Sequence, residues 1–173
     1  MLYLYQKSVQ SNLCIKEINC LKKIAKDSLS IALSIVLKNF YQQLNEKNFI
    51  LELFFINDNY MKKINFKYRN INKPTNVLSL QLIDKNDFIN GISFIEIALG
   101  SIFISTDTLV KESKEHNIDI QDYFIQLAVH GLLHLFGYDH NNDKEAQLMT
   151  NIEEQILNSL QVNAKSIVSN YWN

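Results

Sequence analysis

The sequence predicts an α+β fold, in which a mixed β-sheet is packed with helices. Two observations carry this prediction: most strand patterns lie before Ser105, and three helical patterns follow it in a row. The chain of 173 residues has 4 Gly and 1 Pro, with no internal repeat, low-complexity tract or Pro/Gly/Ser-rich linker. We therefore predict a single domain over residues 1–173.

The chain begins with short strand patterns. Strands are predicted near Leu2 to Gln6 and near Leu13 to Ile18. A helix is predicted from about Asn19 to Leu44, because apolar residues recur there at i, i+3 and i+4.

The next segment has one strand and one helix. The β-rich run from Phe49 to Asn57 predicts a strand. Asp58 or Asn59 is the expected N-cap of a helix that continues to about Tyr68. Pro74, the only proline, predicts a turn after this helix.

The remaining elements complete the sheet and the helical half. Asn76 to Ile83 predicts a strand. A strand pair is expected between Ile92 and Ser105, as a hairpin or meander broken near Gly100. The three helical patterns that follow are Thr106 to His116, Ile120 to Phe136 and Asp143 to Leu160.

Charge is divided unevenly along the chain, although the net charge is only −1. Residues 59–83 carry five cations and no acid, whereas residues 111–154 carry 3 lysines and 9 acids. These stretches are either two solvated faces or include a phosphate-binding strip, and the sequence leaves both open. Arg69 is the only arginine beside 16 lysines, which hints at planar, multidentate recognition of an oxyanion.

Cysteine content and hydropathy predict a cytoplasmic protein. Cys14 and Cys20 are too few for a disulfide framework, and a reducing cytosol suits them. The unbroken apolar runs are far shorter than the roughly 20 residues that cross a bilayer. The first residues also lack the pattern of a signal peptide. We expect neither secretion nor a membrane partner.

Three of the 4 histidines lie close together in the sequence, at His130, His134 and His140. On a helix, positions i and i+4 point from one face, so His130 and His134 are placed to share a metal ion. Gly137 is expected to end the helix in a left-handed C-cap and to let His140 return as a third ligand. The alternative is a pair of hydrogen-bonded core histidines with a third on the surface.

Three histidines with an open fourth position are typical of a catalytic zinc, one per chain. Such an ion lowers the pKa of water toward about 7 and supplies hydroxide at neutral pH. Asp139 either orients a ligand imidazole or serves the turn, and the sequence does not decide between these roles.

The histidine spacing is that of the metzincin string His-Glu-x-x-His-x-x-Gly-x-x-His, with one difference. Gly131 stands where those proteases have the glutamate that acts as general base. A phosphodiester needs stabilisation of negative charge, which a metal and an arginine provide. Arg69 and its basic stretch fit that demand.

The residues from Ile64 to Leu157 resemble the YbeY-type endoribonucleases, zinc-dependent bacterial enzymes linked to ribosomal RNA maturation. His130-Gly-Leu-Leu-His-Leu-Phe-Gly-Tyr-Asp-His140 matches the family signature H-G-x-L-H-L-x-G-Y-D-H. Asn65-Phe-Lys-Tyr-Arg69 and Pro74-Thr-Asn-Val-Leu-Ser79 resemble two further family segments, with Leu80 where phenylalanine is usual.

Two more segments complete the resemblance. Leu99-Gly-Ser-Ile102 is similar to the family's Leu-Gly-Asp-Ile strand, with Ser101 in place of the aspartate. The acids and the methionine after the third histidine also follow the family pattern, at Asp143, Glu145, Met149 and Glu153.

The resemblance implies a zincin-like metal-binding helix in which His130, His134 and His140 bind zinc and Arg69 is the catalytic residue. It also implies that the substrate is single-stranded ribosomal RNA, cut during 3′-end maturation and in ribosome assembly and quality control. The implied partners are ribosomal RNA, the small ribosomal subunit and the Era GTPase. Two alternatives stay open: a zinc peptidase or amidase, which Gly131 disfavours, and a non-catalytic ribosome-assembly factor.

Overall fold

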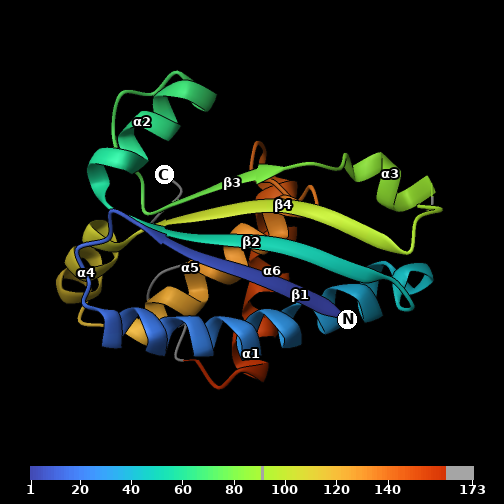
Figure 1. The fold of residues 1–173 in the computed structure, drawn as a ribbon. Coiled ribbons are helices and arrows are strands. Elements are labelled where there is room, and N and C mark those ends of the chain that lie inside the picture. Colours follow the sequence, from blue (N-terminus) through green and yellow to red (C-terminus); the bar gives the residue numbers. More distant parts are fainter. Residues whose placement is uncertain (91, 163–173) are drawn as a thin grey trace.

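A four-stranded mixed sheet forms the centre of the computed structural model, which describes residues 1–90 and 92–162 (Figure 1). The strand order is β1 (Leu2–Val9), β2 (Asn48–Ile56), β4 (Glu96–Ser105) and β3 (Val77–Gln81). β1 is parallel to β2 and β2 to β4, whereas β3 runs antiparallel to β4 at the edge. Helices pack on this sheet, so the predicted α+β class is confirmed.

Most helices lie on one face of the sheet. These are α1 (Ile15–Phe40), α4 (Thr106–Glu115), α5 (Ile120–Leu135) and α6 (Asp143–Ser159). α5 packs directly on β3 and β4, while α1 contacts β1 and α5. Among the described residues, no helix is both long enough and apolar enough to cross a lipid bilayer.

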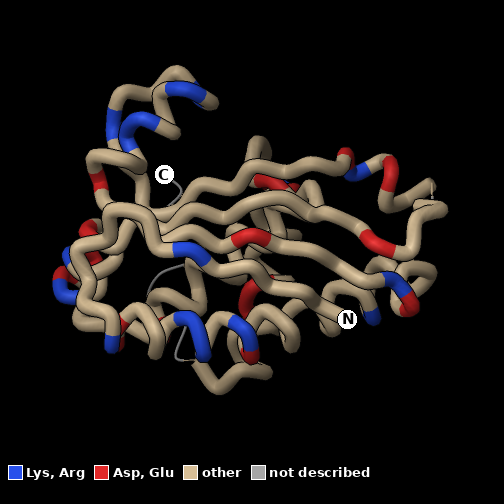
Figure 2. Tube along the Cα trace, viewed as in Figure 1, with Lys and Arg blue, Asp and Glu red and all other residues tan. Residues whose placement is uncertain are grey.

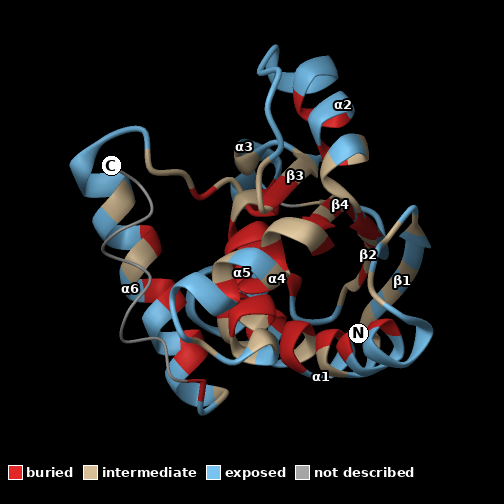
Figure 3. Cartoon of the chain, turned by 90° about the vertical axis from the view of Figure 1, so that its left-hand side faces the viewer, coloured by how far each residue is buried: buried red, intermediate tan, exposed pale blue. Residues whose placement is uncertain are grey.

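The core fills the space between the sheet and these helices (Figure 3). Phe55 of β2 stacks on Phe124 of α5 with ring centroids 5.7 Å apart, and both rings are fully buried. On the opposite face, within residues 1–90 and 92–162, α2 (Asp58–Arg69) covers one end of the sheet. Met61 and Ile64 of α2 pack there on Ile56 and Leu78, and the rest of that face stays partly open.

The strand predicted at Leu13 to Ile18 is wrong, because α1 begins at Ile15. The side chain of Glu17 folds back and accepts a hydrogen bond of 2.9 Å from the backbone N–H of Cys14. This capping contact starts the helix where the apolar alternation predicts a strand. α1 also ends earlier than predicted, at Phe40, and a short 3₁₀ helix, η1 (Gln42–Leu44), follows it.

The strand pair predicted between Ile92 and Ser105 is also wrong, since β4 is one strand. Gly100 does not break it; with a φ of +137° it follows a bulge at Leu99, because the consecutive residues Ile50 and Leu51 of β2 pair with Ala98 and Gly100. A Cβ there would lie 2.1 Å from the carbonyl oxygen of Leu80, so only glycine fits.

Two smaller differences lie near β3. α3 (Lys85–Asn90) was not predicted and follows β3 directly. The N-cap of α2 is Asn57 rather than Asp58 or Asn59, because the Asn57 side chain accepts a hydrogen bond from the Tyr60 N–H at 2.9 Å. The other predicted helices are confirmed, with small shifts at their ends.

Candidate metal centre

α5 carries the first two histidines on a helix that is buried nearly all round. Asp119 caps its start by accepting a hydrogen bond from the Gln121 N–H at 2.7 Å. Ten residues on, His130 is only 4% exposed, whereas His134, one turn later, is half-buried. The helix therefore sets one imidazole in the core and the next at its edge.

Gly137 makes the reversal that follows α5. Its φ is +76°, and its N–H donates to the His134 carbonyl at 2.9 Å. The Tyr138 N–H then donates to the Leu133 carbonyl at 3.1 Å, which closes the end of the helix. The predicted glycine C-cap is confirmed, and the chain turns back so that His140 lies beside α5.

The turn brings the three predicted histidines together. One ring nitrogen from each of His130, His134 and His140 lies within 4.8 Å of the others. The Nε2 atoms of His130 and His134 are 2.9 Å apart. Three imidazole nitrogens at this spacing can hold a metal ion, in the arrangement that leaves one ligand position for water or substrate.

Burial favours the neutral imidazole at this centre. Burial first, and then the nearby rings of His130 and His140, lowers the pKa of His134 from 6.5 to about 4. The carboxylate of Asp139 opposes the shift. His134 is thus neutral at physiological pH, which is the form that binds metals.

Glu153 on α6 contacts the ring nitrogen of His130 that points away from the other histidines. Its Oε1 lies 2.5 Å from Nδ1 of His130, and both side chains are 5% exposed. A carboxylate on Nδ1 fixes the ring so that Nε2 faces the other histidines. The sequence gives no role to Glu153, but it offers a signal: the acid lies in the buried stripe of α6 beside Met149, Ile152 and Ile156.

Asp139 serves the turn. One of its oxygens accepts a hydrogen bond from the His140 N–H at 2.8 Å, and the other accepts from the Asn141 amide. Its Oδ1 also lies 4.0 Å from Nδ1 of His134, too far for a hydrogen bond but close enough for attraction. Desolvation raises the pKa of Asp139, but the hydrogen bonds and the histidines outweigh it and the pKa is lowered.

Gly131 faces the sheet, where α5 passes closest to β3 and β4. Its carbonyl accepts a hydrogen bond of 3.0 Å from Ser79 Oγ. A Cβ at this position would lie 2.9 Å from Ser79 Oγ and 3.0 Å from a methyl group of Ile102. The position that holds the general base in metzincins is therefore filled by the sheet, and a glutamate does not fit there.

Arg69 reaches the same cleft from the opposite side. It is the last residue of α2, and Asn70 follows it in the left-handed conformation with φ 58°. The buried Asn65 donates to the Lys73 carbonyl at 2.7 Å, which ties the end of α2 to the segment before β3. Arg69 is exposed and makes no hydrogen bond or ion pair with any residue that the structure describes.

One cleft of about 1030 Å³ contains both groups. The three histidines line one part of it, and Arg69 with Tyr68 lines another. Figure 2 shows several Lys and Arg positions on α2 and on the segment that follows it. The structure thus places every predicted site residue in a single cavity, a relation that the sequence separation of Arg69 and His130 does not reveal.

Comparison with known proteins gives a consistent family. The family model described as "Endoribonuclease YbeY" matches residues 15–161. An Endoribonuclease YbeY of Prochlorococcus marinus subsp. pastoris is 43% identical over 117 residues, covering 68% of this chain and 64% of the relative. That of Buchnera aphidicola is 33% identical over 149 residues, covering 84% of this chain and 92% of the relative.

Similarity in three dimensions agrees at the level of the fold. The solution structure of TM1509 from Thermotoga maritima superposes with a TM-score of 0.53 at 17% identity, covering 94% of each chain. The matched segment of the family model includes all four predicted site residues, Arg69, His130, His134 and His140. The chain belongs to the Endoribonuclease YbeY family.

Proposed function

We propose that this chain is a zinc-dependent endoribonuclease that cuts single-stranded RNA. The observation that carries the proposal is the shared cleft, in which a three-histidine metal centre faces a free arginine. The family name supports the nuclease activity. By the resemblance, its role is the maturation of ribosomal RNA 3′ ends in ribosome assembly and quality control.

The donor set fits zinc. His130, His134 and His140 would hold the ion, since three neutral imidazoles and one open position are the usual ligands of catalytic zinc. When bound, zinc supplies Lewis acidity and, with it, hydroxide at neutral pH. Glu153 orients His130 for this task.

Arg69 and the lysines of α2 are suited to bind the RNA backbone and to stabilise the charge on the phosphate that reacts. The guanidinium is planar, carries five donors and is not engaged by another described residue, so it can pair with two phosphate oxygens at once. The charge on a phosphodiester increases toward the transition state, where such a donor stabilises it most. The surrounding lysines attract the backbone without sequence preference.

The alternative as a peptidase or amidase is weakened by the packing at Gly131. No side chain fits at that position without displacing Ser79 and Ile102, so the general base of the metzincins has no equivalent there. The alternative as a non-catalytic assembly factor predicts a metal without hydrolysis.

One experiment separates these functions. Purified protein with measured zinc content is incubated with labelled single-stranded RNA and with casein, each with and without a chelator. We expect chelator-sensitive cleavage of RNA alone, lost in His134→Ala and kept in His116→Ala, which removes the exposed histidine outside the cluster. Cleavage of casein would support the peptidase, and zinc binding without cleavage of either would support the assembly factor.

The cellular role needs a separate test. The proposed partners are ribosomal RNA, the small ribosomal subunit and the Era GTPase, in the cytoplasm. Depleted cells should accumulate ribosomal RNA with unprocessed 3′ ends, and the parent gene should restore maturation. Full restoration by His134→Ala would contradict an enzymatic role and favour the assembly factor.

A further inference from the structure

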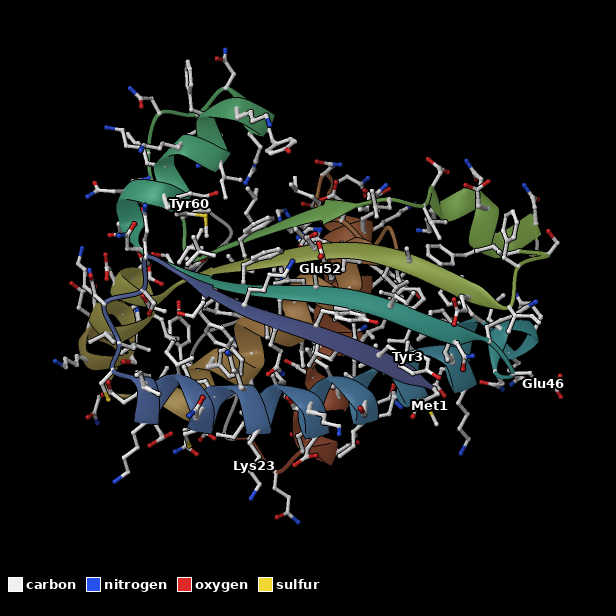
Figure 4. The ribbon with its side chains drawn as sticks, viewed as in Figure 1. Met1, Tyr3, Lys23, Glu46, Glu52 and Tyr60 are labelled. Atoms are coloured by element: carbon white, nitrogen blue, oxygen red, sulfur yellow. The ribbon has the colours of Figure 1, made fainter. Side chains whose placement is uncertain are left out.

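The outer face of the sheet presents an aromatic and acidic surface that the metal centre does not use. Phe54 of β2 and Phe103 of β4 stack there, with ring centroids 4.7 Å apart and an angle of 10° between the ring planes. Glu52 and Ser101 are paired on the same two strands, two residues earlier. Figure 4 shows Glu52 over the middle of the sheet, away from the end that α2 covers.

This surface is continuous with the site described above. Glu52, Phe54 and Phe103 line the same cleft as Arg69 and His134. Its volume of about 1030 Å³ is at the upper end of the range for drug-sized ligands, so it has room for more than one nucleotide. An RNA strand whose phosphate meets Arg69 would therefore lay a neighbouring base on the outer face of the sheet.

Glu52 is held in place but keeps free acceptor capacity. Its Oε2 accepts a hydrogen bond of 2.9 Å from Ser101, and its Oε1 lies 3.6 Å from Nζ of Lys7. A carboxylate has about four lone-pair sites, so these two contacts leave room for further donors. Lys7 also lies 5.5 Å from the centre of the Phe54 ring, on the same surface.

A carboxylate beside aromatic rings suits a nucleobase better than a phosphate. The phosphate would be repelled, whereas a base is neutral and stacks on aromatic side chains. Guanine presents two adjacent donors, N1–H and N2–H, on its Watson–Crick edge, and these match the two oxygens of one carboxylate. Uracil and cytosine offer a single donor group, and adenine offers one donor beside an acceptor.

Ser101 helps to fix the acidic group on the sheet. Its hydroxyl donates a hydrogen bond to Glu52 across the strand pair. The carboxylate at this point of the cleft therefore belongs to β2 and is held by β4.

We infer that Glu52, with the Phe54–Phe103 stack, forms a guanine-binding subsite for single-stranded RNA. This inference rests on the proposed function, because it needs RNA in the cleft. It adds a base preference to a site whose metal and arginine contact only the backbone.

The test measures binding separately from cleavage. Dissociation constants are determined by fluorescence anisotropy for RNA pentamers UUXUU, where X is G, inosine, A, C or U, using the full chain with chelator present. We expect guanine to bind about tenfold more tightly than uracil, the size of one good bidentate contact. Inosine lacks the N2 amino group and should lose most of that preference.

Three variants assign the preference to this surface. Glu52→Gln replaces one acceptor by a donor, so guanine should lose its advantage and adenine should gain. Phe103→Leu keeps an apolar side chain but removes the ring, and should weaken every pentamer about tenfold. The double variant Glu52→Ser/Ser101→Asp moves the carboxylate across the strand pair to β4 and should keep the guanine preference.

Glu46→Gln is the charge-matched control, since Glu46 is exposed and lies at the far end of the molecule in Figure 4. Thermal midpoints confirm that each variant folds. Equal binding of all pentamers, or a guanine preference that survives Glu52→Gln, would overturn the subsite while RNA cleavage still stands. Absence of any RNA binding by the parent would overturn the proposed function and the subsite together.

Discussion

His130 on α5 is 4% exposed and bonded to a buried glutamate, whereas Arg69 on α2 is exposed and bonded to no described residue. The two sides of the cleft are thus built in opposite ways. α5 is packed between the sheet, α1, α4 and α6, while α2 packs through Met61 and Ile64 on one end of the sheet (Figure 3).

This difference fits two different tasks. A metal ion needs ligands fixed within tenths of an ångström, and packing with a supporting hydrogen bond fixes them before the metal arrives. A phosphate on a flexible strand needs charge and donors that adjust as the strand enters. We therefore expect substitutions on the α5 side to change metal affinity and stability. Substitutions on the α2 side should change the binding and cleavage of RNA.

The largest effect is expected from Arg69→Lys, which keeps the charge but loses the fork of donors. We expect kcat/KM for RNA cleavage to fall by about 10²- to 10³-fold, as for removal of one transition-state donor. Zinc content and the thermal midpoint should match those of the parent, because the Arg69 side chain is exposed and forms no ion pair with a described residue. Steady-state cleavage, elemental analysis and calorimetry check the three readouts.

Lys23→Gln is the control for Arg69→Lys. Lys23 is exposed on α1 and does not line the cleft, so cleavage should change little. Near-parental cleavage by Arg69→Lys would show that a positive charge is sufficient and would remove the donor geometry from the mechanism.

The next effect tests the rigid side. Glu153→Gln removes the charge behind His130, and we expect zinc to bind about 10- to 100-fold more weakly. The neighbouring Glu154→Gln is the matched control, because Glu154 is exposed on the same helix. Competition titration with a metal indicator measures both. Equal zinc affinity in the two variants would mean that packing alone orients His130.

The pH dependence of stability tests the burial of His134 on the α5 side of the cleft. The pKa of His134 is about 4 in the folded chain and 6.5 in its reference state. Between these values the unfolded chain binds more protons than the folded chain. The contribution of His134 to the stability of the metal-free chain is therefore present at pH 7 and lost as the pH falls toward 4. His134 alone should lower the free energy of unfolding by about 2 kcal/mol between pH 7 and 5.

Urea unfolding of the metal-free parent and of His134→Gln isolates this contribution. The parent should lose more stability than the variant over that interval. Identical pH profiles would show that the His134 imidazole is as well solvated in the folded chain as in the unfolded one, against the burial seen here.

The sequence predicts the elements whose signals are local. The i, i+3, i+4 spacing of α1 and the β-rich run of β2 need no partner to be recognised, and the three histidines follow from helical periodicity plus one glycine. Leu13 to Ile18 misleads because its apolar alternation competes with the Glu17 cap, which forms only when the side chain folds back. β4 misleads because Gly100 is read as a break, whereas the strand continues through it with one extra residue, Leu99, opposite the step from Ile50 to Leu51 of β2.

The rest of the site depends on contacts between distant segments. Glu153 meets His130 across 23 residues, and Glu52 meets Ser101 across 49. No local pattern reports such pairs, because they arise from the packing of α6 on α5 and from the pairing of β2 with β4. Gly131 is a similar case. The sequence shows only that the glutamate of the metzincins is missing at this position, whereas the structure shows that the sheet occupies the space of its side chain.

The smallest effect is expected from the lysines of α2. It tests whether their position, and not only their charge, contributes to RNA binding. Lys62, Lys63 and Lys67 are exposed and have no role in the packing of α2 on the sheet. If each contacts one phosphate, their joint replacement by Gln should reduce the slope of log Kd against log salt by about 2, at about 0.7 per contact for a single strand. The matched control replaces Lys16, Lys23 and Lys26 of α1 by Gln. These substitutions remove the same charge on the opposite side of the molecule. Equal slopes in the two triple variants would mean that net charge, rather than the position of α2 above the cleft, attracts the RNA.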